Sequence, residues 1–276
     1  MARMASAWPG GITKWMEGRT LYLSIPFTWL LSRGLATVRQ RSTLWDCAIV
    51  GGPAVCLMPG FFADVPWVQE GKAANVLQRV NPHATRTTEG CPNHCRFCAV
   101  SRLEPQFREL EDWPDLPILI DNNLLAASIG HLDKVFDRLE RWGWADFNQG
   151  LDARQLNSYH AERLARIGKP LVRLALDHAG QQDTWERAFA LLRKHGIALS
   201  RIRSYALIGF DSGPDEAWRR CEWLEGHRIK ALPMWFHELD ALKPNIVTAK
   251  QRELGWTDYE RRRIMQWYYQ HKKAAA

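Results

Sequence analysis

Two kinds of apolar pattern alternate along the chain from about residue 83 onward. The first is a short apolar or β-branched run that suits a strand; the strands expected on this basis cover 85–88, 117–120, 144–148, 171–176, 204–208 and 231–236. The second places apolar residues three or four positions apart, as on one face of a helix; the helices expected on this basis cover 131–142, 159–167, 183–195 and 214–226. Strands that alternate with helices in this way predict an α/β fold with a parallel sheet and helices outside it.

Several helix starts are marked by residues that favour a first turn. Pro214 suits the first turn of the helix that it opens. Asp183 with Glu186, and Thr257 with Glu260, have the spacing of a capping box, in which two side chains satisfy backbone N–H groups at a helix start. The second pair predicts one more helix near the C-terminus.

The N-terminal part of the chain has a weaker pattern. Residues 1–20 show no period and are interpreted as an irregular arm, whereas Thr20–Ile25 and Asp46–Val50 have the composition of short strands. The chain is therefore expected to divide into a reduced α/β N-terminal extension, a core and a C-terminal helical extension, covering 1–82, 83–238 and 239–276.

Charge and composition narrow the class of protein. The 276 residues carry a formal net charge of +7, which suits a polyanionic partner such as nucleic acid and is equally compatible with a general solubility bias. No apolar run approaches the roughly 20 residues that span a bilayer, because the longest, Leu21–Leu31, is interrupted by Ser24 and Pro26. The first residues lack the apolar segment of a secretory signal. Six cysteines, three of them clustered with the spacing of a metal site, favour a cytoplasmic protein over a disulfide framework.

Three of the six cysteines fall within eight residues. Cys91, Cys95 and Cys98 follow a predicted strand, in a polar loop that could direct all three sulfurs toward one point. Iron–sulfur clusters and structural zinc sites normally use four protein ligands, so three cysteines indicate a metal centre with one open position. A zinc site completed by His94 is an alternative, although His94 lies inside the first cysteine spacing.

The Cys-x-x-x-Cys-x-x-Cys motif, with Phe97 before its last cysteine, resembles the signature of the radical S-adenosylmethionine (SAM) superfamily. The resemblance covers about residues 83–236 and implies a partial (β/α)6 TIM-like barrel with its active site at the carboxyl ends of the strands. It also implies a [4Fe–4S] cluster on Cys91, Cys95 and Cys98, and SAM bound to the open iron. The family reaction yields a 5′-deoxyadenosyl radical that abstracts hydrogen, with electrons from a low-potential donor of the flavodoxin or ferredoxin type.

Residues near two expected SAM groups follow from this resemblance. Phe97 would pack near the adenine. Asp121 and Asn123, ahead of Asn122, follow the second strand where the family has a Gly-Gly-Glu motif, and they would accept hydrogen bonds from the SAM amino group. An Asx-turn that caps the next helix is the alternative for this triplet.

Three more strand ends carry candidates for SAM contacts. Arg154 resembles an arginine of cobalamin-associated members and would hold the methionine carboxylate; a solvated helix-start arginine is the alternative. Asp177, with His178 beside it, stands where the family has Gly-x-Glu-Ser and would bind a ribose hydroxyl. Gly209 resembles the position that lets the adenine approach the backbone.

Two further features could extend the chemistry. Val50-Gly51-Gly52-Pro53 is similar to a strand exit of cobalamin-binding domains, but the chain lacks the Asp-x-His-x-x-Gly motif that supplies the cobalt ligand, so cobalamin is not expected and a tight turn is favoured over a phosphate cradle. Three other cysteines either hold a second cluster or are ordinary buried residues; they are Cys47, Cys56 and Cys221.

The sequence is therefore interpreted as a radical SAM enzyme of unidentified substrate, possibly nucleic acid or nucleotide-derived. The C-terminal Arg261–Arg263, with Trp267, Tyr268 and Tyr269, mixes basic and aromatic groups as single-stranded nucleic-acid platforms do. A helix whose aromatic face packs on the core is the alternative for this segment. The alternative for the whole chain is a non-catalytic, metal-stabilised nucleic-acid-binding protein.

Overall fold

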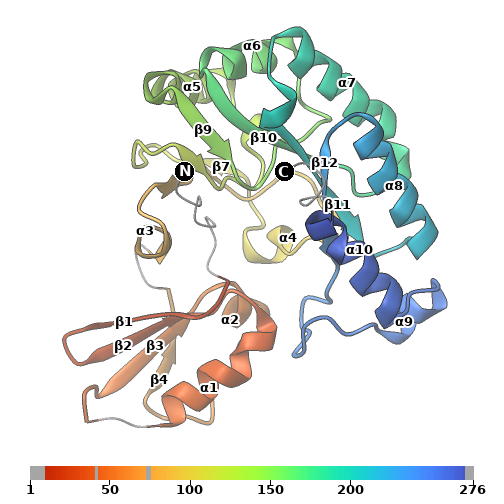
Figure 1. Ribbon diagram of the computed structural model, residues 1–276. Helices are drawn as coiled ribbons and strands as arrows, with labels where there is room; N and C mark the ends of the chain where they lie inside the picture. The colour runs from red at the N-terminus through yellow and green to blue at the C-terminus, as the bar shows by residue number, and fades with distance from the viewer. Residues whose placement is uncertain (1–9, 41–42, 73–75, 271–276) are drawn as a thin grey trace. The chain divides into compact units, whose positions relative to one another are not determined.

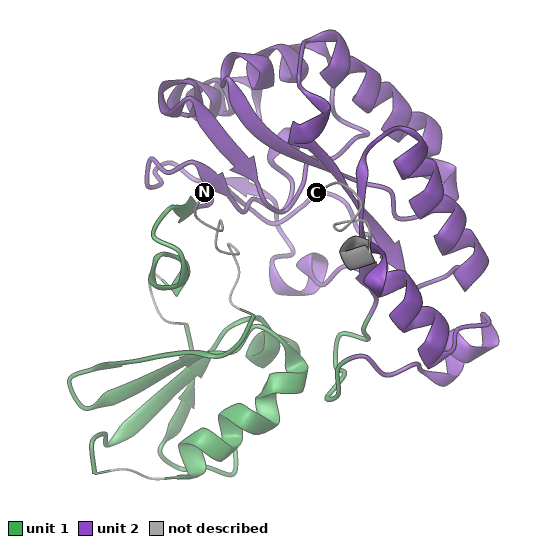
Figure 2. Ribbon diagram, viewed as in Figure 1, with its two compact units in different colours: residues 1–84, 237–244 green, residues 85–236, 245–276 purple. Residues whose placement is uncertain are grey.

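The computed structural model describes residues 10–40, 43–72 and 76–270. The chain forms two compact units, shown in Figure 2: unit 1 comprises Met1–Ala84 and His237–Pro244, and unit 2 comprises Thr85–Phe236 and Asn245–Ala276. Each unit has its own cluster of buried apolar side chains. The C-terminal segment from Asn245 belongs to the same unit as the cysteine loop.

Unit 1 is a four-stranded sheet with short helices. The strands lie in the order β1-β2-β3-β4 and cover Thr13–Glu17, Thr20–Ser24, Cys47–Gly51 and Val68–Glu70. The first pair is antiparallel, and the other pairs are parallel. The helices are α1, α2 and α3, which cover Leu31–Arg39, Pro53–Leu57 and Val76–Val80, and the 3-10 helix η1 covers Thr28–Leu30.

The irregular arm expected over residues 1–20 is wrong for the part that the structure describes. Strand β1 occupies Thr13–Glu17 and forms a hairpin with β2. Gly18, at the turn, has a φ of 57°, which glycine adopts without strain. Across the strands the rings of Trp15 and Tyr22 stack with centroids 5.1 Å apart. The hairpin is stabilised by this cross-strand pair, which depends on register and not on a local period.

The glycine pair at the end of β3 forms the tight turn into α2 that was favoured above. Gly52 has a φ of 99° and leads into α2. A Cβ atom added to Gly51 would lie 2.0 Å from the carbonyl oxygen of Gly71, and one added to Gly52 would lie 2.7 Å from the backbone nitrogen of Ile25. Close backbone packing therefore explains both glycines.

Unit 2 contains the predicted parallel sheet. Its strands lie in the order β12-β11-β10-β9-β8-β5, so neighbours in space are successive strands of the sheet along the chain. The pairs from β8 to β12 are all parallel. In chain order these six strands cover Ala84–Thr85, Ile118–Leu119, Trp144–Phe147, Lys169–Ala175, Ile202–Ile208 and Lys230–Trp235. A separate pair, β6 and β7, covers Thr88–Glu89 and Arg108–Glu109.

Helices connect the successive strands of this sheet. In Figure 1, α5, α6, α7 and α8 follow one another along the same side of the strands, as right-handed crossovers between sequential strands require. The helices α4 to α10 cover Val100–Leu103, Ile129–Trp142, Ser158–Arg166, Gln182–Lys194, Pro214–Gly226, Ala249–Glu253 and Asp258–Gln270. The 3-10 helices η2, η3 and η4 cover Leu124–Ala126, Ala179–Gln181 and Leu199–Arg201. Among the described residues, no helix has the length and apolar character needed to cross a bilayer.

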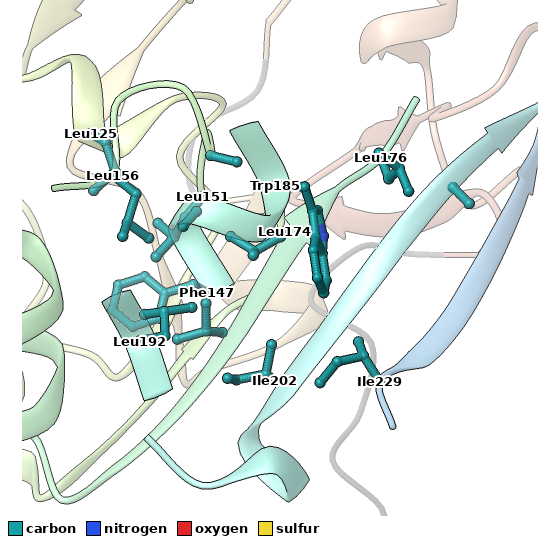
Figure 3. Packing of buried hydrophobic residues seen from close by; sticks show 14 of the residues in the cluster. Leu125, Phe147, Leu151, Leu156, Leu174, Leu176, Trp185, Leu192, Ile202 and Ile229 are labelled. Atoms are coloured by element: carbon teal, nitrogen blue, oxygen red, sulfur yellow. The ribbon is translucent and has the colours of Figure 1, made fainter. Parts of the chain in front are cut away.

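The core of unit 2 lies between the sheet and these helices. Figure 3 shows Leu174 of β10 and Ile202 of β11 with Trp185 and Leu192 of α7. Trp185 is fully buried, and its Nε1 donates a hydrogen bond to Ser204 Oγ at 3.0 Å, so the indole keeps a polar partner. This packing fixes the strands whose carboxyl ends carry the candidate site.

Of the two predicted capping boxes, only the one at Thr257 shows the hydrogen bond from a backbone N–H to the side chain of the cap residue. Thr257 Oγ1 accepts a hydrogen bond from the Glu260 N–H at 3.1 Å. The box of Asp183 and Glu186 is wrong, because α7 begins one residue earlier and its cap, Gln181, has helical dihedrals and no side-chain cap. The 3-10 helix η3 ends where α7 begins. Gln181, the residue before α7, is therefore helical, whereas a capping box needs an extended residue there.

The aromatic side chain of Trp267 packs on the core. Trp267 and Ile264 belong to the buried cluster of unit 2, and Trp267 meets the ring of Trp218 edge-on at 4.7 Å. Its ring is therefore not exposed for base stacking, which supports the packing alternative at this residue. The side chains of Tyr268 and Tyr269 lie outside the described residues.

Candidate functional site

A cleft lies at the carboxyl ends of β8, β9 and β10. We call it the cysteine cleft, because the cysteine loop forms one wall. Its lining residues are Cys91, Asn93, Cys95, Phe97, Cys98, Asn122, Asn123, Gln149, Gly150, Leu151, Asp152, Ala153, Arg154, Ala175, Asp177, Gln181 and Thr184. The predicted site residues of the cysteine loop line the cleft, and so do three that follow strands. They are Cys91, Cys95, Cys98 and Phe97 of the loop, with Asn123, Arg154 and Asp177.

The cysteine loop is shaped by its own backbone. Gly90, before the first cysteine, has a φ of 74°, and a Cβ atom there would lie 2.2 Å from the carbonyl oxygen of Gln106. The Cys98 N–H donates to the Cys95 carbonyl at 3.0 Å, which closes a turn. All three thiols are free and half-buried.

The three sulfurs do not converge on a single metal ion. Among the described residues, no group of three or more His, Cys, Asp or Glu side chains is placed to hold one ion. This finding concerns a single ion, so the expectation that the three sulfurs face a common cluster stays a prediction. His94 lines a neighbouring hollow and not the cysteine cleft, which removes support for a zinc site completed by this histidine.

Asp152 connects three parts of the cleft. Its carboxylate accepts hydrogen bonds from Asn93 Nδ2 at 2.9 Å, from Arg154 Nε at 2.8 Å and from Asn123 Nδ2 at 3.4 Å. Burial alone would raise the pKa of Asp152, but the hydrogen bonds from Arg154 and Asn93 outweigh it and lower that pKa. Asp152 was not among the predicted site residues, although its place two residues before Arg154, in the segment after β9, was a usable signal.

Arg154 lies between the carboxylate and a thiol. Its hydrogen bonds to Asp152 raise the pKa of Arg154, and the guanidinium also interacts with Cys95. Burial raises the pKa of the Cys95 thiol, while the charge of Arg154 opposes that rise. Arg154 therefore places a fixed positive charge beside the cysteine loop, as an anionic ligand there would require.

Asn123 offers an unused acceptor in the cleft. Its Nδ2 atom lies 3.5 Å from Cys91 Sγ, and its Oδ1 atom is buried without a hydrogen-bond partner among the described residues. Asn122 also lines the cleft, with its Nδ2 bound to Glu104 Oε2 at 2.8 Å. A buried acceptor without a partner costs free energy unless water or a ligand supplies a donor, so Asn123 Oδ1 can accept a hydrogen bond from a ligand with an N–H or O–H group.

Asp121 does not reach the cysteine cleft, contrary to the expected SAM contact. Its Oδ1 atom accepts hydrogen bonds from the backbone N–H and the hydroxyl of both Thr87 and Thr88. Its Oδ2 atom is enclosed without a partner among the described residues. Burial raises the pKa of Asp121, against the opposing effect of these hydrogen bonds. The carboxyl group thus fixes the strand before the cysteine loop.

A second hollow adjoins the cleft. It shares Cys95, Phe97, Arg154, Asp177 and Gln181 with the cleft, and adds His94, Arg96, His178, Leu207, Phe210 and Asp211. The two cavities, of about 200 and 260 Å³, together reach the range of roughly 300–1,000 Å³ typical of small-molecule sites. The rings of Phe97 and Phe210 meet edge-on at 5.5 Å. The hollow therefore offers an aromatic surface beside the polar cleft.

Asp177 lies where the two cavities meet. Burial raises the pKa of Asp177, and the charges of Arg220 and Arg154 offset only part of this effect. The Asp177 N–H donates to Gln181 Oε1 at 2.9 Å. Its carboxyl group is available to a ligand that spans both cavities.

Gly209 lines neither cavity. It has a φ of 78°, and a Cβ atom there would lie 2.5 Å from the ring of Trp235. Packing against Trp235 explains this glycine, so the expected backbone approach of adenine to Gly209 is not supported. The adjacent residues Leu207 and Phe210 line the second hollow instead.

Among the described residues, the remaining cysteines belong to no group of three or more side chains that could hold a metal ion. Cys221 belongs to the core of unit 2, as an ordinary buried cysteine does. Cys47 and Cys56 are exposed, so the prediction that they are buried is wrong.

Glu104 holds the base of the cysteine loop. Its carboxylate accepts hydrogen bonds from Arg86 Nη2 at 2.7 Å, from the Gly90 N–H at 2.8 Å and from Asn122 Nδ2 at 2.8 Å. Burial raises its pKa, but these bonds outweigh burial and the pKa is lowered. A lowered pKa in the folded state gives stability that is present above the unfolded pKa and lost as pH falls through the folded pKa.

We expect Glu104→Gln to lower the free energy of unfolding by about 1–3 kcal/mol at pH 7, because charge-assisted bonds to Arg86 are lost. The difference from wild type should shrink below about pH 4, where the wild-type carboxylate also becomes protonated. Urea unfolding at several pH values measures it. Glu111→Gln, at an exposed glutamate, is the control; an equal loss at pH 3 and pH 7 would contradict the role of the charge.

Comparison with known protein families and with curated proteins finds no match for this sequence.

Proposed function

We propose that the protein is a radical SAM enzyme with its active site in the cysteine cleft. The observation that carries the proposal is the shared lining of this cleft. Three thiols of one short loop face it together with Asn123, Arg154 and Asp177, which follow three successive strands of a parallel sheet. Sequential strands with helices on one side are compatible with a partial (β/α)6 barrel, in which catalytic groups gather at the carboxyl ends.

The residues of the cleft fit a [4Fe–4S] cluster. In a four-iron cluster each thiolate binds a different iron, so Cys91, Cys95 and Cys98 need not meet at one point. The Asn93 N–H lies 3.4 Å from Cys91 Sγ, and Asn123 Nδ2 lies 3.5 Å from the same sulfur. Such donors stabilise the charge of cluster sulfurs. The chemistry supplied by the cluster when bound is a one-electron transfer that cleaves SAM to methionine and a 5′-deoxyadenosyl radical able to abstract hydrogen.

The other residues of the two cavities match the groups of SAM. The free Oδ1 of Asn123 suits the amino group, and Arg154 suits the carboxylate. Asp177, between the cavities, suits a ribose hydroxyl. Phe97 and Phe210 of the second hollow suit the adenine ring. SAM would therefore extend from the cleft into the hollow.

The proposal is tested anaerobically on the full-length protein. After reconstitution with iron and sulfide, SAM and dithionite are added, and 5′-deoxyadenosine is quantified against a sample without dithionite. We expect about four irons per chain and reductant-dependent 5′-deoxyadenosine. Bound zinc with no affinity for SAM would overturn the proposal and favour a metal-stabilised binding protein.

A further inference from the structure

Asp152 is the anchored partner of its ion pair with Arg154. The side chain of Asp152 is 11% exposed, whereas that of Arg154 is 48% exposed. The Arg154 N–H donates to Asp152 Oδ1 at 3.0 Å, which closes an Asx-turn and fixes the carboxylate. A long, exposed arginine side chain loses rotamer freedom when it is held in one geometry. The position of the Arg154 guanidinium at the cleft therefore depends on Asp152.

The carboxylate of Asp152 engages one edge of this guanidinium. Arg154 Nε donates to Oδ1 and Arg154 Nη2 donates to Oδ2, both at 2.8 Å. A guanidinium carries five N–H donors in a rigid planar fork, so this pairing leaves the end of the fork, which carries Nη1, for other acceptors. Arg154 lines both cavities and also interacts with Cys95. Asp152 thus directs the remaining donors of Arg154 toward the cysteine loop and toward a ligand.

The same carboxylate orients the amide of Asn123. Asn123 Nδ2 lies 3.4 Å from Asp152 Oδ2 and 3.5 Å from Cys91 Sγ. An ionised aspartate only accepts hydrogen bonds, so the amide must present its nitrogen to Asp152. The amide oxygen Oδ1 is consequently turned away from the carboxylate, and it is buried without a partner among the described residues. Asn123 lines the cleft with this acceptor available.

Asp152 also connects the cysteine loop to the segment after β9. Asn93 Nδ2 donates to Asp152 Oδ2 at 2.9 Å, and the Asn93 N–H lies 3.4 Å from Cys91 Sγ. One carboxylate therefore receives donors from the loop, from the segment after β8 and from its own segment. These contacts give the cleft a donor at Arg154 and an acceptor at Asn123.

We propose that Asp152 is a positioning residue that makes the cysteine cleft selective for a ligand with both a carboxylate and an amino group. Asp152 acts through Arg154, which donates to the carboxylate, and through Asn123, which accepts from the amino group. The identity of the ligand as SAM rests on the proposed function. The two orientations rest on the hydrogen bonds of one carboxylate.

An asparagine in place of Asp152 would keep the shape of the side chain and lose its polarity. One of its two polar atoms is an NH₂ donor, which would face donors of Arg154 or Asn123. The guanidinium would lose its charged partner, and the Asn123 amide would no longer be held with Oδ1 turned away. Both changes weaken the match to an amino acid group, whereas neither alters the aromatic surface of the second hollow.

The test compares two ligands on the reconstituted full-length protein by equilibrium dialysis. The first is SAM, and the second is 5′-methylthioadenosine, which has the adenosine and the sulfur but neither the amino nor the carboxylate group. We expect Asp152→Asn to weaken SAM binding by about tenfold or more and 5′-methylthioadenosine binding by less than about twofold. Asp152→Glu keeps the charge and should bind SAM more tightly than Asp152→Asn. Asp215→Asn, at an exposed residue in the first turn of α8, is the control and should match wild type for both ligands.

Equal losses for the two ligands in Asp152→Asn would indicate a general structural role and overturn the inference. Wild-type SAM affinity in Asp152→Asn, or a wild type that binds SAM no more tightly than 5′-methylthioadenosine, would overturn it as well. The two proposals can fail separately. A SAM preference that Asp152→Asn removes, without 5′-deoxyadenosine in the wild type, would sustain the role of Asp152 and sink the enzyme. Formation of 5′-deoxyadenosine, with SAM affinity unchanged in Asp152→Asn, would sink the role of Asp152 alone.

Discussion

On the proposed function, Cys98→Ala is expected to bind less iron than the wild-type protein and to form no 5′-deoxyadenosine. Cys98 lines the cleft with Cys91 and Cys95, and burial raises the pKa of its thiol. Binding to iron requires the thiolate, and an alanine would leave one iron of the proposed cluster without a protein ligand. The loss of activity should be at least about 100-fold, since changes in residues that merely support a ligand cost roughly 10–100-fold.

The measurements are iron and sulfide content, with 5′-deoxyadenosine quantified after addition of SAM and dithionite. Cys56→Ala is the matched control, because it removes one thiol at an exposed position of unit 1. Iron content and product equal to wild type in Cys98→Ala would show that this cysteine does not hold the cluster. Equal losses in both variants would indicate a general effect of thiol removal on reconstitution.

The parallel sheet could be predicted because its signals are local. The strands of unit 2 are short apolar or β-branched runs, and the intervening helices have one apolar face. Hairpin β1–β2 was missed because its stability depends on a cross-strand pair, Trp15 with Tyr22, which no local period reveals.

Several of the predicted site residues line one cleft, whereas Asp121 and Gly209 do not. Arg154 and Asp177 reach the cleft because they lie in the segments that follow β9 and β10, and the carboxyl ends of parallel strands share one edge. The residues after β8 are Asp121, Asn122 and Asn123. Asp121 does not line the cleft, because its carboxylate is bound by Thr87 and Thr88, which lie more than 30 residues earlier in the chain. Long-range contacts of this kind are not encoded in spacing.

The same limit applies to Gly209. A glycine after a strand suits the close approach of a ligand, but here the ring of Trp235 occupies the space where a side chain would lie. Both explanations predict glycine, so the residue type alone could not separate them. Asp152 was missed for the opposite reason, because its role becomes visible only when Asn93 and Asn123 are brought to it.

Asp121→Ala is expected to destabilise the protein by at least about 3 kcal/mol, because it leaves buried donors of Thr87 and Thr88 without an acceptor. Asp121→Asn should keep most of the stability, since its Oδ1 can accept the same hydrogen bonds. The raised pKa of Asp121 adds a pH dependence. Stability tied to a raised carboxyl pKa is present below the unfolded pKa and lost as pH rises through the folded pKa. The asparagine variant should therefore gain relative to wild type as pH rises.

Urea unfolding of both variants across pH, together with SAM binding to the folded proteins, separates a structural role from a cofactor contact. Asn123→Ala is the matched comparison, because it alters a neighbouring residue that does line the cleft. We expect SAM affinity to fall in Asn123→Ala and to persist in Asp121→Asn. A stable Asp121→Asn protein that no longer binds SAM would contradict this placement, because the carboxylate itself would then be needed at the ligand. Retained affinity would identify Asp121 as the residue that fixes the strand from which the cysteine loop departs.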